Sequence, residues 1–138
     1  MPSTGGEATL FSPDPSAYLP HRAPFLFIDR VLARESGISA TGEFTVPAGC
    51  GYFPPLLLVE SMAQLGGIAA GQRQGEGGVL AALGRVQLPR SVGSGAVLRV
   101  RSQVVKVFGA LVLIEGEVRT AGKIIASATL TLALGGAS

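Results

Sequence analysis

The side chain best suited to acid–base chemistry in this sequence is Glu60. It lies in residues 56–74, where apolar residues recur at helical spacing and Glu60 is the only acidic residue. An apolar surrounding favours the protonated form of a carboxylic acid, which is the form that a general acid needs. Glu60 is therefore a candidate acid catalyst. An acidic residue also stabilises the first turn of a helix through the helix dipole, so a purely structural role stays open.

Acid–base catalysis also needs a base, and a histidine is the usual one. The chain contains one histidine, His21. Histidine is the side chain whose charge ordinarily changes near neutral pH. A reaction that uses an imidazole must therefore use His21, from the same subunit or from a partner. Between Pro20 and Arg22, the ring could also serve only to bind the backbone at a turn.

Composition limits the class of protein. Of the 138 residues, 47% are hydrophobic and 14% are charged, against about 25% charged in ordinary soluble chains. We expect the excess apolar surface to be covered by a partner subunit and to bind an apolar ligand. A net charge of +2, with no basic cluster among aromatic residues, argues against nucleic-acid binding.

The sequence also predicts a location. It has no run of about 18 apolar residues and no basic-then-apolar segment at its start, so we expect neither a membrane span nor a signal peptide. The single cysteine, Cys50, cannot form an intrachain disulfide, which fits a reducing cytoplasm. We expect no cofactor and no metal.

Hydrophobic periodicity predicts one domain at residues 18–138, after a flexible arm at residues 1–17 that is rich in Gly, Ser, Thr and Pro. Residues 25–34 and 38–46 read as a hairpin, the second strand with Ile38, Ala40, Gly42, Phe44 and Val46 on one face. Residues 56–74 read as a central helix that begins after two prolines.

The second half of the chain predicts strands at 79–88, 98–105, 111–119 and 124–134, with a bulge at 104–105 and a tight turn at 121–122. On the last strand, Ile124, Ala126, Ala128, Leu130, Leu132 and Leu134 should face inward. The fold class is therefore α+β, with a single antiparallel sheet wrapped around one helix and the strands after the helix forming a meander.

Two long motifs, in order, resemble those of the 3-hydroxyacyl-(acyl carrier protein) dehydratases. The first is Tyr-Leu-Pro-His-Arg-Ala-Pro-Phe-Leu-Phe-Ile-Asp-Arg-Val at 18–31, and the second joins Gly-Tyr-Phe-Pro at 51–54 to Leu-Val-Glu-Ser-Met-Ala-Gln at 58–64. Gly-Arg-Val at 84–86, followed by Pro89, resembles the next strand of that family. The resemblance covers residues 18–134 and is specific because two separate motifs agree.

The resemblance implies a hot-dog fold, a homodimer or a trimer of dimers, and an acyl tunnel between subunits. It implies loss of water from a 3-hydroxyacyl thioester of acyl carrier protein or coenzyme A, in fatty-acid or related lipid and polyketide metabolism. Glu60 matches the acid, and backbone amides at the helix start would hold the thioester oxygen. Phe25, Phe53, Pro54 and Gln64 would contact substrate, although Gln64 could instead hold Glu60 or satisfy backbone groups.

Two departures from the family pattern affect the proposed reaction. The catalytic histidine of the family corresponds here to Tyr52, and a phenol is protonated at neutral pH and so is a weak base. The stretch between Pro54 and the helix is also several residues shorter. We therefore expect a dehydratase that uses Glu60 with His21 or Tyr52. The alternatives are a non-catalytic acyl-binding or heterodimer subunit, and a thioesterase in which Glu60 activates water.

Overall fold

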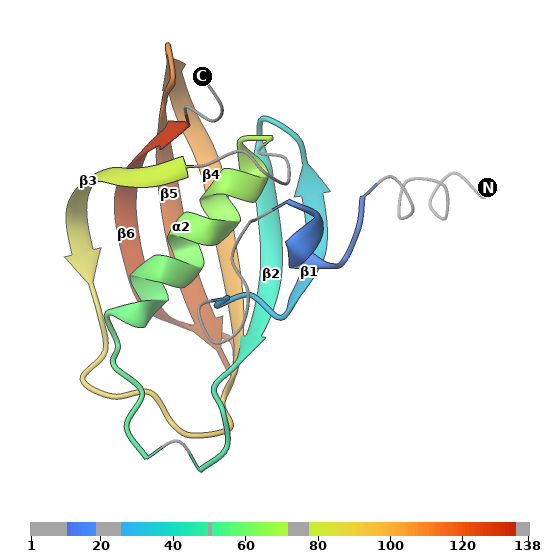
Figure 1. Ribbon diagram of the computed structural model, residues 1–138. Helices are drawn as coiled ribbons and strands as arrows, with labels where there is room; N and C mark the ends of the chain where they lie inside the picture. Colours follow the sequence, from blue (N-terminus) through green and yellow to red (C-terminus); the bar gives the residue numbers. More distant parts are fainter. Residues whose placement is uncertain (1–10, 19–25, 50, 72–77, 135–138) are drawn as a thin grey trace.

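The computed structural model describes residues 11–18, 26–49, 51–71 and 78–134. A six-stranded antiparallel sheet wraps around one long helix (Figure 1). The elements are a short 3-10 helix η1 (Pro15–Ala17), β1 (Arg30–Glu35), β2 (Ser39–Thr45), α2 (Leu57–Ala69), β3 (Gly78–Gln87), β4 (Val97–Phe108), β5 (Leu111–Thr120) and β6 (Lys123–Leu134). The predicted α+β architecture is confirmed.

Alternation along the strands sets which side chains meet the helix. On β4, Leu98, Val100 and Ser102 are buried, whereas Arg99 and Arg101 are exposed. This is the pattern of a sheet with one face on the core and the other in water. The predicted bulge at 104–105 is confirmed by a register shift between Val104 and Lys106.

The sheet order differs from the predicted meander. The order is β1-β2-β4-β5-β6-β3, so β3 crosses to the far edge and pairs with β6 instead of β4. The crossing leaves the other edge of β3 without a strand in the described part of the chain. Strand pairing depends on packing across the whole sheet, and β3 has no periodic signal that would reveal its partner.

Two predicted inward residues are exposed. Ile124 is 52% exposed because the register shifts between Val118 and Arg119, which places Ile124 opposite Arg119 on the outer face. A bulge of this kind moves a side chain to the other side of the sheet. Ile38 is 50% exposed because it lies in the tight turn before β2, where its amide donates to the Glu35 carbonyl at 2.8 Å, and not within the strand.

The helix ends earlier than predicted, at Ala69, and residues 72–74 lie outside the described part of the chain. Its last carbonyl groups have partners in the β1–β2 hairpin. The Arg34 Nε donates to the Ile68 carbonyl at 2.9 Å, and the Gly37 amide donates to the Ala69 carbonyl at 2.7 Å. The hairpin therefore caps the helix and fixes its axis relative to the sheet.

The predicted arm, residues 1–17, falls partly outside the described residues, which begin at Phe11. From there the chain contacts the domain: Phe11 packs against the core, Pro15 is buried, and the Val31 amide donates to the Pro13 carbonyl at 2.8 Å. Ordered packing therefore extends at least to Phe11.

Close contact between α2 and the sheet depends on Gly116 in β5. A Cβ atom at this position would lie 2.8 Å from the Met62 Sδ and 2.9 Å from the Met62 Cβ. The Met62 Cβ is fixed to the helix backbone, so rotation of the side chain cannot relieve the contact. Gly116 therefore sets the distance between the helix and the sheet.

We expect Gly116→Ala to destabilise the protein by about 1–3 kcal/mol, because overpacking moves the helix or the strand. Urea unfolding followed by circular dichroism measures the change. Gly93→Ala is the matched control, since an added Cβ there meets no atom within 4 Å. Equal stability of the two variants would show that Gly116 does not set the distance between the helix and the sheet.

Candidate functional site

The candidate site lies where β2 ends and α2 begins. Residues 46–49 and 51–56, termed the site loop, connect the two elements. The Val46 amide donates to the Ala96 carbonyl at 2.9 Å, and the Gly49 amide donates to the Ser94 Oγ at 2.7 Å. The site loop is therefore tied at its start to the loop that precedes β4.

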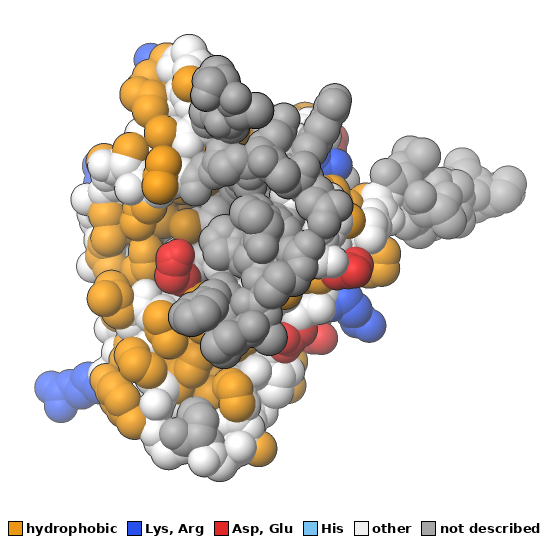
Figure 2. Space-filling model, viewed as in Figure 1, with side chains coloured by type: hydrophobic (Ala, Val, Ile, Leu, Met, Phe, Trp, Pro, Cys, Tyr) orange, Lys and Arg blue, Asp and Glu red, His pale blue; other side chains and the backbone are white. Residues whose placement is uncertain are grey.

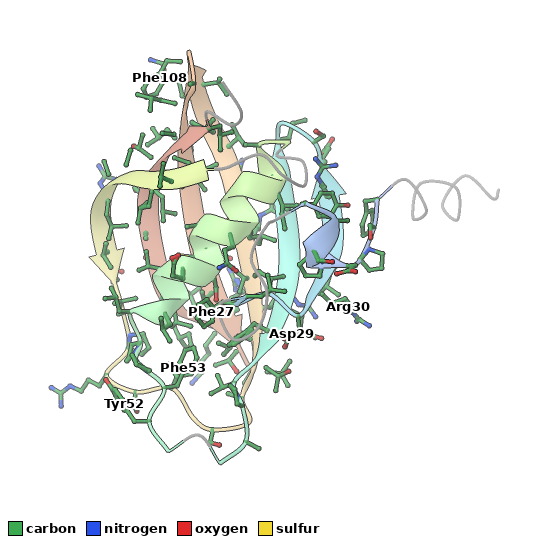
Figure 3. The ribbon with its side chains drawn as sticks, in the orientation of Figure 1. Phe27, Asp29, Arg30, Tyr52, Phe53 and Phe108 are labelled. Carbon is green, nitrogen blue, oxygen red and sulfur yellow. The ribbon has the colours of Figure 1, made fainter. Side chains whose placement is uncertain are left out.

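Neighbouring aromatic residues of the site loop have opposite environments. Tyr52 is 67% exposed, whereas Phe53 is 6% exposed and packs against Phe44, with 5.8 Å between ring centroids. Figure 3 shows Tyr52 pointing away from the body of the domain and Phe53 lying against it. Phe53 thus anchors the loop, and Tyr52 is available to a ligand or a partner.

Glu60 is half-buried in the first turn of α2. Three residues of the helix are only partly buried, and they recur at every third position: Leu57, Glu60 and Ala63. Residues at this spacing share one side of a helix. The Glu60 carboxylate therefore lies on an apolar stripe that the sheet does not fully cover.

The amides at the start of α2 already have acceptors. The amides of Leu57, Leu58 and Val59 donate to the carbonyls of residues 54, 55 and 56 at 2.9, 2.9 and 3.0 Å. The resemblance implied that amides at this end would hold a thioester oxygen. In this chain these three amides close a tight first turn, which fits the direct passage from the two prolines into the helix.

Gln64 satisfies a backbone group. Its Oε1 accepts from the Phe27 amide at 2.8 Å, and the side chain is 3% exposed. The sequence left open whether Gln64 holds Glu60 or the backbone, and the structure shows a backbone contact. Asp29 has a similar role at the hairpin, where its Oδ2 accepts from the Thr45 amide at 2.6 Å.

The structure brings some predicted site residues together and leaves others undescribed. Tyr52, Phe53, Pro54 and Glu60 lie on the site loop and the first turn of α2. His21 and Phe25 lie outside the described residues. Ser61 is not among the predicted site residues, although a serine within an apolar helix indicates a specific polar contact, here with the Phe27 carbonyl.

Within the described part of the chain, no three His, Cys, Asp or Glu side chains are placed to hold a metal ion. Among the same residues, no helix is long and apolar enough to cross a membrane.

Comparison with known proteins places the chain in a family. No family model matches it. The 3-hydroxyacyl-[acyl-carrier-protein] dehydratase FabZ of Moorella thermoacetica is 32% identical over 130 residues, which cover 85% of this chain and 91% of that protein. The Streptococcus sanguinis FabZ is 34% identical over 129 residues, covering 85% and 92%.

Solved structures agree on the fold. The dehydratase heterocomplex ApeI:P from Xenorhabdus doucetiae contains a chain that superposes with a TM-score of 0.78 at 21% identity, covering 88% of this chain and 90% of that one. A Streptococcus mutans protein bound to acetyl-CoA superposes with a TM-score of 0.62 at 16% identity, covering 77% and 87%. The sequence relatives, together with this hot-dog architecture, show that the chain belongs to the FabZ family of 3-hydroxyacyl-[acyl-carrier-protein] dehydratases.

Proposed function

We propose that the chain acts on 3-hydroxyacyl thioesters of acyl carrier protein or coenzyme A as a dehydratase, in fatty-acid or related lipid or polyketide metabolism. Membership of the FabZ family supports the reaction class. The main support for the proposal is the position of Glu60. It is half-buried on the apolar stripe of α2 that the sheet does not fully cover, directly after the site loop. The cytoplasm is the proposed location, in keeping with the single cysteine.

In this reaction a base removes the proton from the carbon next to the thioester carbonyl. The bond between the following carbon and its hydroxyl breaks, a double bond forms, and the hydroxyl leaves as water with a proton from the Glu60 carboxyl. His21 and Tyr52 are the two candidate bases within the chain. Tyr52 is exposed on the site loop, so its hydroxyl is open to a ligand.

The β3 edge is the proposed site of dimer formation. Its hydrophobic residues are exposed although they lie in a strand: Val79 at 67%, Leu80 at 39%, Leu83 at 42% and Val86 at 36%. In Figure 2, hydrophobic side chains gather on the side of the molecule where Figure 1 shows β3. An exposed apolar edge strand is a template for pairing with another chain. A second copy paired there would cover the edge.

We expect Leu83→Lys to convert the dimer into a monomer at micromolar concentration, because a charge would be buried in the paired edge. Light scattering measures the mass. Val97→Lys is the matched control: Val97 is similarly exposed, at 53%, but lies on β4 away from the edge. A monomeric wild-type protein, or loss of the dimer in both variants, would contradict the β3 interface.

A second candidate function is that of one subunit of a heteromeric dehydratase. The observation in its favour is Tyr52, which leaves this chain without a histidine at the family's catalytic position. A solved structure with the same fold is itself a dehydratase heterocomplex. In that case the chain alone would bind acyl thioesters without turnover, and turnover would appear on addition of a relative that carries the histidine.

Product analysis tests the proposal. Purified protein is incubated with 3-hydroxyacyl, enoyl and saturated acyl thioesters, and the products are identified by mass spectrometry. Interconversion of the first two substrates supports a dehydratase. Cleavage of the saturated thioester would instead indicate a thioesterase, and binding without turnover would indicate the heteromeric role.

A further inference from the structure

Two buried polar side chains of α2 bind both backbone polar groups of one residue, Phe27. The Ser61 Oγ donates to the Phe27 carbonyl at 2.9 Å, and the Gln64 Oε1 accepts from the Phe27 amide at 2.8 Å. Ser61 is 0% exposed and Gln64 is 3% exposed. Burial of a polar group is unfavourable unless it has a partner, so these two contacts fix Phe27 to the helix at two points.

Phe27 belongs to residues 26–29, which we term the bridge segment. This segment contacts both β2 and α2, the two elements that the site loop connects. The Phe27 ring packs edge-on against Phe44, with 5.9 Å between centroids, and Phe44 packs against Phe53 of the site loop. At the other end of the segment, Asp29 accepts from the Thr45 amide, directly before the loop. Figure 3 shows Phe27 and Phe53 below α2, and Asp29 further along, on the side of β1 and β2.

These contacts form a continuous path from the helix that carries Glu60 to the loop that carries Tyr52. The path passes from Ser61 and Gln64 to Phe27, and from there through Phe44 to Phe53. Aromatic side chains of this size have few rotamers and transmit a displacement well when they are packed. A shift of Phe27 would therefore move the site loop relative to Glu60.

We propose that Ser61 and Gln64 are positioning residues that set the distance between the site loop and Glu60 through the bridge segment. The predicted effect of Ser61 and Gln64 on the reaction rate rests on the dehydratase function proposed above. Its structural part, the coupling of α2 to the site loop, can be measured without turnover.

The test compares Ser61→Ala and Gln64→Leu with a matched control, Ser102→Ala. Ser102 is also 0% exposed, and its Oγ donates to the Met62 carbonyl of the same helix at 2.8 Å, but it lies on β4. A displacement of about 1 Å at a reacting group can cost about a hundredfold in rate. We expect kcat to fall about ten- to a hundredfold in the first two variants, with KM changed by less than about threefold. Ser102→Ala should retain the wild-type kcat.

Amide hydrogen exchange of the site loop provides the readout that does not depend on activity. We expect exchange to rise at least about tenfold in Ser61→Ala and Gln64→Leu, and to stay unchanged in Ser102→Ala. Equal exchange and equal kcat in Ser61→Ala and Ser102→Ala would overturn the positioning role. If the wild-type protein shows no turnover, the dehydratase proposal fails, and loop exchange alone decides the inference.

Discussion

Glu60→Gln is expected to lower the rate of 3-hydroxyacyl thioester dehydration by a hundredfold or more, since positioned general acids contribute about 10²–10⁴-fold. The amide retains the size of the carboxyl group but cannot give a proton to the departing hydroxyl. Glu60 is only half-buried and lies on the side of α2 that the sheet does not fully cover, so the fold should tolerate the change. Initial rates at saturating substrate, with the melting temperature recorded for each variant, measure the effect.

The control for this substitution is Glu115→Gln, which makes the same change of side chain on the exposed outer face of β5. We expect it to leave the rate unchanged. If Glu60→Gln and Glu115→Gln behave alike, Glu60 stabilises the first turn of the helix through the dipole and takes no part in the reaction.

Tyr52→His is expected to raise the dehydration rate by about a hundredfold, because an imidazole can accept the substrate proton near neutral pH and a phenol is a far weaker base. The substitution introduces the histidine that the resemblance to the family implies at this position. Tyr52 is 67% exposed, so little packing is lost and the stability should change by less than about 0.5 kcal/mol.

Tyr52→Phe separates two roles of the native residue. If the phenol is the base, this variant loses the wild-type activity, and if His21 is the base, the activity remains. A Tyr52→His protein no faster than the wild type would show that the shortened passage into α2 leaves this position out of reach of the substrate.

Local sequence signals were sufficient for most of the fold. Alternation with a period of two located the strands, as on β4, where Leu98 and Val100 are buried and Arg99 is exposed. The helix followed from apolar spacing after two prolines. Its end was overestimated, because the carbonyls that close it have their partners, Arg34 and Gly37, in a hairpin distant in sequence.

The position of β3 and the contacts of the bridge segment could not be predicted. The pairing of β3 with β6 depends on packing of the whole sheet, and local residues do not encode it. The contacts of Ser61 and Gln64 with Phe27 span 34 and 37 residues of sequence. For Glu60 and Tyr52, the sequence predicted a shared site, and the structure places them on adjacent elements.

In the proposed function, this member of the FabZ family adds water to acyl thioesters or removes it from them, and uses Glu60 to do so. The most direct test is the mass of an enoyl thioester of acyl carrier protein after incubation with the wild-type protein and with Glu60→Gln. We expect a gain of one water in the wild-type sample, far above the rate without protein, and almost none with Glu60→Gln. An unchanged enoyl thioester in both samples, or release of the free acid, would contradict it.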